Sequence, residues 1–135
     1  MKTLMALIAS CFVATFAGCP DMSVKIVKVE VDMAKIVAKA QLVSLQRRKG
    51  RQWREDYDFM ELKMNYTHFY KWTSPFKKIY APNPLRMQTS TYERCRITYD
   101  VGADYLLACL DVYGCFLMRP FKDLKPEEKA LLKIT

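Results

Sequence analysis

The sequence has few of the residues on which common catalytic and metal-binding sites depend. Its 135 residues include one histidine, His68, and only four glycines. A single histidine excludes a catalytic pair of histidines and any metal site built on several of them. Four scattered glycines do not form a phosphate-binding loop, and no Ser-His-Asp or paired-carboxylate motif is present. We therefore expect neither an enzyme nor a resident cofactor or metal ion.

The sequence also lacks an apolar run long enough to cross a membrane, which takes about 20 residues. It begins instead with a base, Lys2, followed by a short apolar run to Val13 and small residues up to Ala17. This pattern is typical of a secretory signal peptide. We predict a signal peptide over 1–17 and a mature domain over 18–135, with a start at Cys19 as the alternative. A competing interpretation is that 16–19 is a bacterial lipobox with lipid on Cys19, the one case in which a membrane partner is expected.

Removal of the leader changes the counts of charge and cysteine. The formal charge falls from +8 to +7 with the loss of Lys2, and Cys11 is lost as well. An even number of cysteines in a short secreted chain is typical of two disulfides. The four that remain are Cys19, Cys95, Cys109 and Cys115. The positive charge predicts an acidic partner, and without a nucleic-acid-binding motif we expect an extracellular protein or a sulfated glycan.

The alternation of apolar and polar residues predicts a mainly β domain. The expected strands cover 27–33, 57–64, 76–80, 95–99, 105–110 and 115–118. Segment 34–43 fits the period of a strand and that of a helix. The basic segment 46–51 contains Gly50 and predicts a hairpin turn, and the two prolines of 82–84 predict a loop. Pro126, followed by two acids, predicts a C-terminal helix, so the pattern favours a small barrel or sandwich with one helix.

Two surface features are candidate binding sites. The first is a basic hairpin tip that suits an acidic protein or a sulfated glycan, although a solvated turn has the same composition. Its residues are Arg47, Arg48, Lys49, Arg51, Trp53 and Arg54. The second is an aromatic run, which fits either an exposed anchor patch or packing against the sheet. Its residues are Tyr66, His68, Phe69, Tyr70 and Trp72. Asn65 begins an Asn-Tyr-Thr sequon and is a candidate glycosylation site.

Segment 95–108 resembles the netrin-like module, with Cys95, a Val-Gly turn at 101–102 and a Tyr-Leu-Leu-Ala strand. Segment 115–124, Cys-Phe-Leu-Met-Arg-Pro-Phe-Lys-Asp-Leu, is similar to the inhibitory domain of tissue inhibitors of metalloproteinases. Segment 32–43 resembles that family's first barrel strand, and the short chain resembles netrin-like proteins secreted by nematodes. The resemblance implies an OB-type closed β-barrel with a C-terminal α-helix, and a strand over 34–43.

The resemblance also implies disulfide pairs. It favours Cys19 with Cys95 and Cys109 with Cys115, with Cys19–Cys115 and Cys95–Cys109 as the alternative. Inhibitors of that family bind the protease zinc through the amine and carbonyl of an N-terminal cysteine. In this sequence that edge is Cys19 and Pro20, and the second cysteine of the usual Cys-x-Cys start is missing.

We therefore expect a secreted module that binds an extracellular protein at a host or tissue interface, because the scaffold is kept while its inhibitory edge has changed. Inhibition of a zinc endopeptidase through Cys19 is one alternative. Binding of heparin or another sulfated glycan through the basic segment 47–54 is the second.

Overall fold

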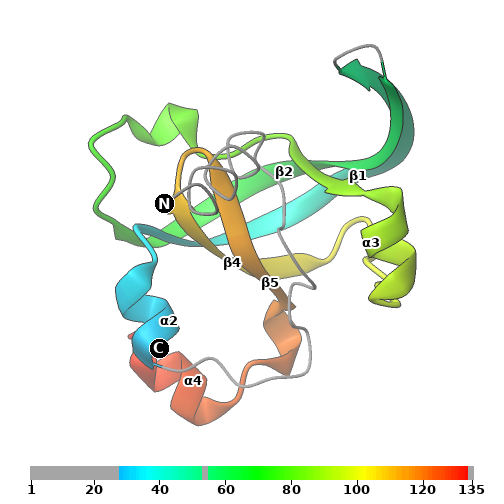
Figure 1. Ribbon diagram of the computed structural model, residues 1–135. Coiled ribbons are helices and arrows are strands. Elements are labelled where there is room, and N and C mark those ends of the chain that lie inside the picture. Colours follow the sequence, from blue (N-terminus) through cyan, green and yellow to red (C-terminus); the bar gives the residue numbers. More distant parts are fainter. Residues whose placement is uncertain (1–27, 53–54, 134–135) are drawn as a thin grey trace.

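We describe residues 28–52 and 55–133 of the computed structural model, without the side chains of residues 51–57. The strands are β1 (Ile36–Gln52), β2 (Glu55–Trp72), β3 (Leu85–Gln88), β4 (Asp104–Asp111) and β5 (Gly114–Pro120). The helices are α2 (Lys28–Met33), α3 (Thr89–Arg94) and α4 (Pro126–Leu131), with short 3-10 helices η1 (Lys78–Tyr80) and η2 (Phe121–Asp123). Figure 1 shows the strands forming one curved sheet, with α2 and α4 together at one end.

The five strands form one antiparallel sheet in the order β3-β2-β1-β4-β5. β1 is central because its residues 36–41 pair with β2 along one edge and with β4 along the other. It pairs with β2 from Ile36↔Trp72 to Gln52↔Glu55, and with β4 only from Ile36↔Cys109 to Gln41↔Asp104. The remainder of β1 pairs with β2 alone, and the two strands form an arm (Figure 1) that carries β3 on residues 59–62 of β2 and ends in a two-stranded tip. The mainly β class is thus confirmed, whereas closure of the barrel stays a prediction, since no ladder joins β3 to β5 among the described residues.

Near the beginning of β1, alternate residues are buried on opposite faces of the sheet. This arrangement requires the two-residue period of a strand. Ile36, Ala38, Ala40 and Leu42 alternate into the main hydrophobic core. Val37 points the other way, into a second cluster with Leu106 and Leu117 of β4 and β5 and with the C-terminal Leu124 and Leu132. A period of two residues is that of a strand, so segment 34–43 is a strand for the most part, as the family resemblance implied.

The C-terminal helix is held to the sheet by a buried ion pair. Arg119 of β5 donates from Nη1 to Oε2 of Glu128 at 2.5 Å, and the two side chains are 4% and 0% exposed. The other carboxylate oxygen of Glu128 accepts from the backbone N–H of Lys125 at 3.0 Å. Arg119 also donates to the carbonyl of Asp123 at 3.3 Å. The helix predicted from Pro126 is confirmed, and this pair explains what fixes its position.

Three predicted strands are wrong. Segment 27–33 contains the helix α2, in which Val29 and Met33 are largely exposed, so the alternation there does not reflect burial. Segment 76–80 contains the 3-10 helix η1, and the strand that follows is β3. Segment 95–99 forms a turn after α3. Its Ile97 and Tyr99 do point into the core, but the backbone has a positive φ of 53° at Arg96 and does not join a ladder.

The remaining strand predictions are confirmed with changed limits. Segment 57–64 lies within β2, and 105–110 and 115–118 lie within β4 and β5. A hairpin joins β1 to β2, but the turn predicted at 46–51 is wrong, because these residues belong to β1 and its ladder with β2 continues to Gln52↔Glu55. The loop predicted at 82–84 lies between η1 and β3.

Candidate interaction surfaces

Two arginines of the basic tip are paired within the arm. Arg47 donates to the carboxylate of Asp58 at 2.9 Å, and Arg48 donates from Nε to Glu61 at 2.9 Å. The hydrogen bond from Arg47 lowers the pKa of the Asp58 carboxyl, and the same contact raises the pKa of Arg47. These acids compensate part of the positive charge that the sequence places at the tip. The arm therefore offers an anionic glycan less charge than the composition of 47–54 indicates.

Of the other residues predicted for the basic tip, Lys49 is exposed on β1. The side chain of Arg51, and all of Trp53 and Arg54, lie outside the described residues. A role of these six residues in binding a partner or a glycan thus stays a prediction.

Most of the aromatic run packs against the sheet. The rings of Tyr66 and Phe69 stack at 5.4 Å, and Trp72 meets Phe69 edge-on at 5.2 Å. All three contact the main core. The ladder between β1 and β2 shifts register near Tyr70, and such a β-bulge brings residues three apart onto one face. His68 is exposed and its ring lies 4.4 Å from that of Tyr70.

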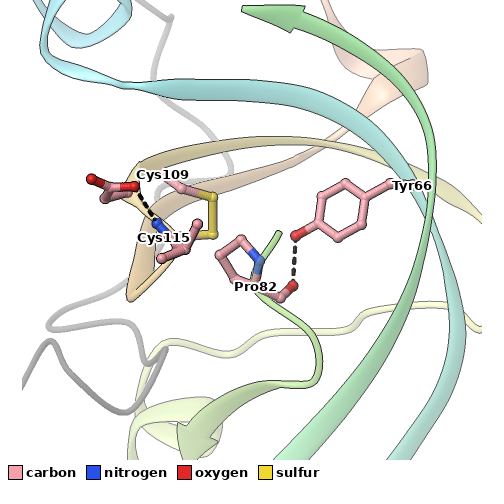
Figure 2. The surroundings of a disulfide bond; sticks show 6 residues. Tyr66, Pro82, Cys109 and Cys115 are labelled. Atoms are coloured by element: carbon pink, nitrogen blue, oxygen red, sulfur yellow. Dashed lines mark hydrogen bonds between the residues drawn. A yellow bond between two sulfur atoms is a disulfide. The ribbon is translucent and has the colours of Figure 1, made fainter. Parts of the chain in front are cut away.

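Tyr66 also ties β2 to the loop before β3. Its hydroxyl donates to the carbonyl of Pro82 at 2.6 Å, and burial raises its pKa. Figure 2 shows this contact beside the disulfide of β4 and β5. The predicted glycosylation residue Asn65 is exposed on the same strand, and the hydroxyl of Thr67 in its sequon donates to the carbonyl of Lys39 at 3.1 Å. Glycosylation stays a prediction.

Cys109 and Cys115 form a disulfide across the β4–β5 hairpin, with their Cα atoms 3.6 Å apart (Figure 2). The favoured pair is therefore present, and the alternative of Cys95 with Cys109 is wrong. Cys95 is disulfide-bonded as well, and its partner lies outside the described residues, so Cys19–Cys95 stays a prediction. Residues 1–17, Cys19 and Pro20 also lie outside the described part, which leaves the signal peptide and the inhibitory edge as predictions.

An apolar surface that the sequence reading missed lies where the loop between β2 and β3 meets the β4–β5 hairpin. We call it the apolar patch. It consists of Phe76, Ile79, Tyr80, Leu110 and Tyr113, which are 40%, 81%, 58%, 42% and 46% exposed. The rings of Phe76 and Tyr113 meet edge-on at 5.8 Å, so the two segments are in contact. The signal for this loop was present in the sequence, since Pro75 and Pro82 enclose the apolar residues and disfavour a paired strand.

Asp111 holds the two segments of the apolar patch together. Its carboxylate accepts from the hydroxyl of Ser74 at 2.5 Å and from the backbone N–H of Val112 at 2.7 Å, and it pairs with Lys35 at 3.5 Å. Burial by itself raises the pKa of this carboxyl, but the hydrogen bonds and the charge of Lys35 outweigh burial and lower the pKa below its ordinary value of 3.8.

The lowered pKa of Asp111 predicts a stability difference that depends on pH. A carboxylate with a lower pKa in the folded state contributes stability above its unfolded pKa of 3.8 and loses this contribution as the pH falls through the folded value. Asp111→Asn should therefore lower the free energy of unfolding by about 1 kcal/mol at neutral pH, and the difference from the wild type should shrink in acid. Urea denaturation over a pH series measures it. Asp123→Asn is the control, and a difference independent of pH contradicts the prediction.

A cleft of about 370 Å³ lies between α2, the end of β2 and the C-terminal helix. It is lined by Lys28, Val31, Asp32, Val37, Tyr70, Lys71, Leu131, Leu132 and Lys133. Three of its charged groups are engaged within the protein: Lys71 donates to the carbonyl of Val31 at 2.9 Å, and Lys28 pairs with Asp32 at 2.8 Å. In the described ranges, no three His, Cys, Asp or Glu side chains gather as metal ligands. The same residues contain no helix that could span a membrane.

The fold and its surfaces define a small, mainly β, disulfide-containing domain with exposed loops. A model of the family described as excretory-secretory protein 2 matches residues 17–133, so the chain belongs to that family. The family's name indicates secretion from the organism. No curated protein matches the chain.

A solved structure supports the fold. The crystal structure of Ancylostoma ceylanicum Excretory-Secretory Protein 2 is similar with a TM-score of 0.52, covering 91% of this chain and 96% of that one. The two sequences are 19% identical, and at that level the match shows a shared fold only.

Proposed function

We propose that this chain is a secreted netrin-like module that binds an extracellular protein at a host or tissue interface. The observation that carries the proposal is the match to the excretory-secretory protein 2 family over 17–133. It is supported by the likeness of 95–124 to netrin-like modules and by the central position of β1, which pairs with β2 and β4. Fold alone does not define function, so the argument also needs a surface.

The surface chemistry favours a binding role. The sheet and its buried ion pair form a rigid scaffold, and binding residues are commonly found on loops that such scaffolds present. The apolar patch offers aromatic and aliphatic anchors of the kind enriched at interface centres, and the formal charge of +7 that we expect for the mature chain accelerates encounter with acidic partners.

A screen against extracellular protein domains tests the proposed function. The full secreted chain, labelled away from its lysines, is applied to an array of extracellular ectodomains at physiological salt. We expect saturable binding to a small subset at micromolar or lower concentration. A basic control protein of similar size and charge should not bind that subset. If no ectodomain binds the chain better than it binds the control, the proposal is wrong.

The same preparation separates binding from inhibition. Chelation of a protease zinc requires a free amine on Cys19, so N-terminal sequencing identifies whether that residue begins the mature chain. Sub-micromolar inhibition across a panel of zinc endopeptidases would replace the proposed function with the inhibitory one.

A further inference from the structure

We infer that the apolar patch is the docking surface of this module, and that it fits an extracellular protein whose site has an apolar pocket surrounded by acidic side chains. The inference rests on the proposed function and adds to it the surface and the chemistry of the partner. Three properties of the patch carry it: exposure, rigidity and the charge around it.

The most exposed side chains of the patch do not contribute to the hydrophobic core. Ile79 is 81% exposed and Tyr80 58%, and neither belongs to the hydrophobic clusters of the sheet. Phe76 and Tyr113 contact each other, and this contact joins the loop that carries Ile79 and Tyr80 to the hairpin that carries Leu110. Contiguous exposed apolar groups on a secreted domain mark sites of interaction.

The patch is rigid although it is exposed. The indole N–H of Trp72 donates to the carbonyl of Phe76 at 2.9 Å, and the backbone N–H of Phe76 donates to the hydroxyl of Ser74 at 3.2 Å. The turn at Ile79 is closed by two backbone hydrogen bonds, from Tyr80 to Lys77 at 2.9 Å and from Ala81 to Lys78 at 3.0 Å. A surface held in place before binding loses little conformational entropy when a partner docks. The hydrogen bonds therefore hold the loop in one conformation before binding, which favours high affinity.

The loop between β2 and β3 carries only positive charges. From Leu62 to Tyr92 the sequence contains no Asp or Glu. The bases of this segment are Lys63, Lys71, Lys77, Lys78 and Arg86. Two of them, Lys77 and Lys78, lie beside Phe76 and Ile79 in the loop and are exposed. The nearby acid Asp111 is engaged by Ser74 and Lys35. An apolar centre with a basic rim is complementary to an apolar pocket with an acidic rim.

A protein partner fits this surface better than a membrane. Anionic lipids are concentrated in the cytoplasmic leaflet, which a secreted protein does not meet, so a basic rim would find little opposite charge on an outer leaflet. A sulfated glycan would use the lysines but would leave the aromatic and aliphatic centre without a counterpart.

A peptide selection tests the patch directly. The full secreted chain is used to select binders from a phage-displayed library of random linear peptides. We expect the enriched peptides to combine Asp or Glu with aromatic or aliphatic residues. Their affinity, measured by fluorescence anisotropy, should fall at least about tenfold for Ile79→Asp. The double variant with Lys77→Glu and Lys78→Glu should also bind the peptides more weakly. The affinity that remains should depend less on salt concentration than that of the wild type.

The control is Val101→Asp, which places the same charge at a loop valine that is 60% exposed and lies outside the patch. It should bind the peptides like the wild type. The high exposure of Ile79 predicts little effect on folding, which circular dichroism and urea denaturation verify for each variant. If Ile79→Asp does not fold, the lysine variant decides the outcome.

Several results would overturn the inference. One is a library that enriches no acidic and apolar peptides, and another is an enriched set that binds Ile79→Asp unchanged. If the wild type binds phosphatidylserine vesicles and Ile79→Asp does not, the patch is a lipid-binding surface. Self-association that this variant removes in sedimentation equilibrium would assign it to a second copy of the chain. If an ectodomain binds the wild type and Ile79→Asp equally well, the patch is not the docking surface, but the proposed function stands. If no ectodomain of the array binds, the proposed function itself is wrong.

Discussion

Replacing Glu128 with alanine will lower the free energy of unfolding by about 3–5 kcal/mol. The carboxylate of this residue is fully buried and accepts hydrogen bonds from Arg119 and from the backbone of Lys125. Without it, a guanidinium that is only 4% exposed remains inside the protein without its carboxylate, and the first turn of α4 loses a cap. Urea denaturation followed by circular dichroism measures the loss.

Two further variants show whether the loss comes from the buried charge. Glu93→Ala makes the same substitution at an exposed position of α3, and its effect should stay within about 0.5 kcal/mol. The double variant Arg119→Met with Glu128→Leu removes both charges, and it should recover most of the stability, because replacing a buried pair by apolar residues is often neutral. A loss below about 1 kcal/mol for Glu128→Ala would mean that water solvates Arg119 and that the pair does not hold the helix.

Removing the disulfide of the β4–β5 hairpin will cost about 2–4 kcal/mol. Cys109 and Cys115 are 0% and 4% exposed and bridge neighbouring strands. The double variant Cys109→Ala with Cys115→Ala frees the hairpin in the unfolded chain and also leaves two smaller side chains in the core. Guanidinium denaturation of both proteins without reductant measures the difference, and Cys95 keeps its own disulfide in each.

The reduced proteins are the control for this comparison. Under reductant the hairpin of the wild type loses its bridge too, so most of the difference should disappear and only the effect of the lost sulfur atoms should remain. A difference of the same size under both conditions would contradict a role of the covalent bond. Because Asp111 and Tyr113 lie within this hairpin, the variant should also weaken binding of the peptides selected on the apolar patch.

Strand prediction succeeded in β1 only with the help of the family resemblance. The apolar pattern of 34–43 fitted a helix as well, because Ile36, Ala38 and Ala40 face one core while Val37 faces the other. Regular alternation misled at 27–33, because alternation does not reveal which side chains find a neighbour to cover them. There Val29 and Met33 remain in solvent.

Candidate sites were harder to predict because pairing across strands is not visible in a linear sequence. The charges of Arg47 and Arg48 are obvious in the composition, but their partners Asp58 and Glu61 become neighbours only once the hairpin register is known. The apolar patch joins Phe76 to Tyr113, which are distant along the chain and meet because β2 and β4 both pair with the beginning of β1. The buried pair of Arg119 and Glu128 depends in the same way on how the last helix folds back.

The length of β1 has a consequence for stoichiometry. The apolar patch lies near Ile36, where β1 pairs with Trp72 and Cys109, whereas the arm ends at Gln52. Sixteen steps of about 3.3 Å give at most about 50 Å between these two ends along the curved strand (Figure 1), and a typical partner covers about 800 Å² of each protein, roughly 30 Å across. If a partner of ordinary size docks on the patch as proposed, the arm stays outside its footprint. We then expect a second molecule to bind the arm of the same chain without competition.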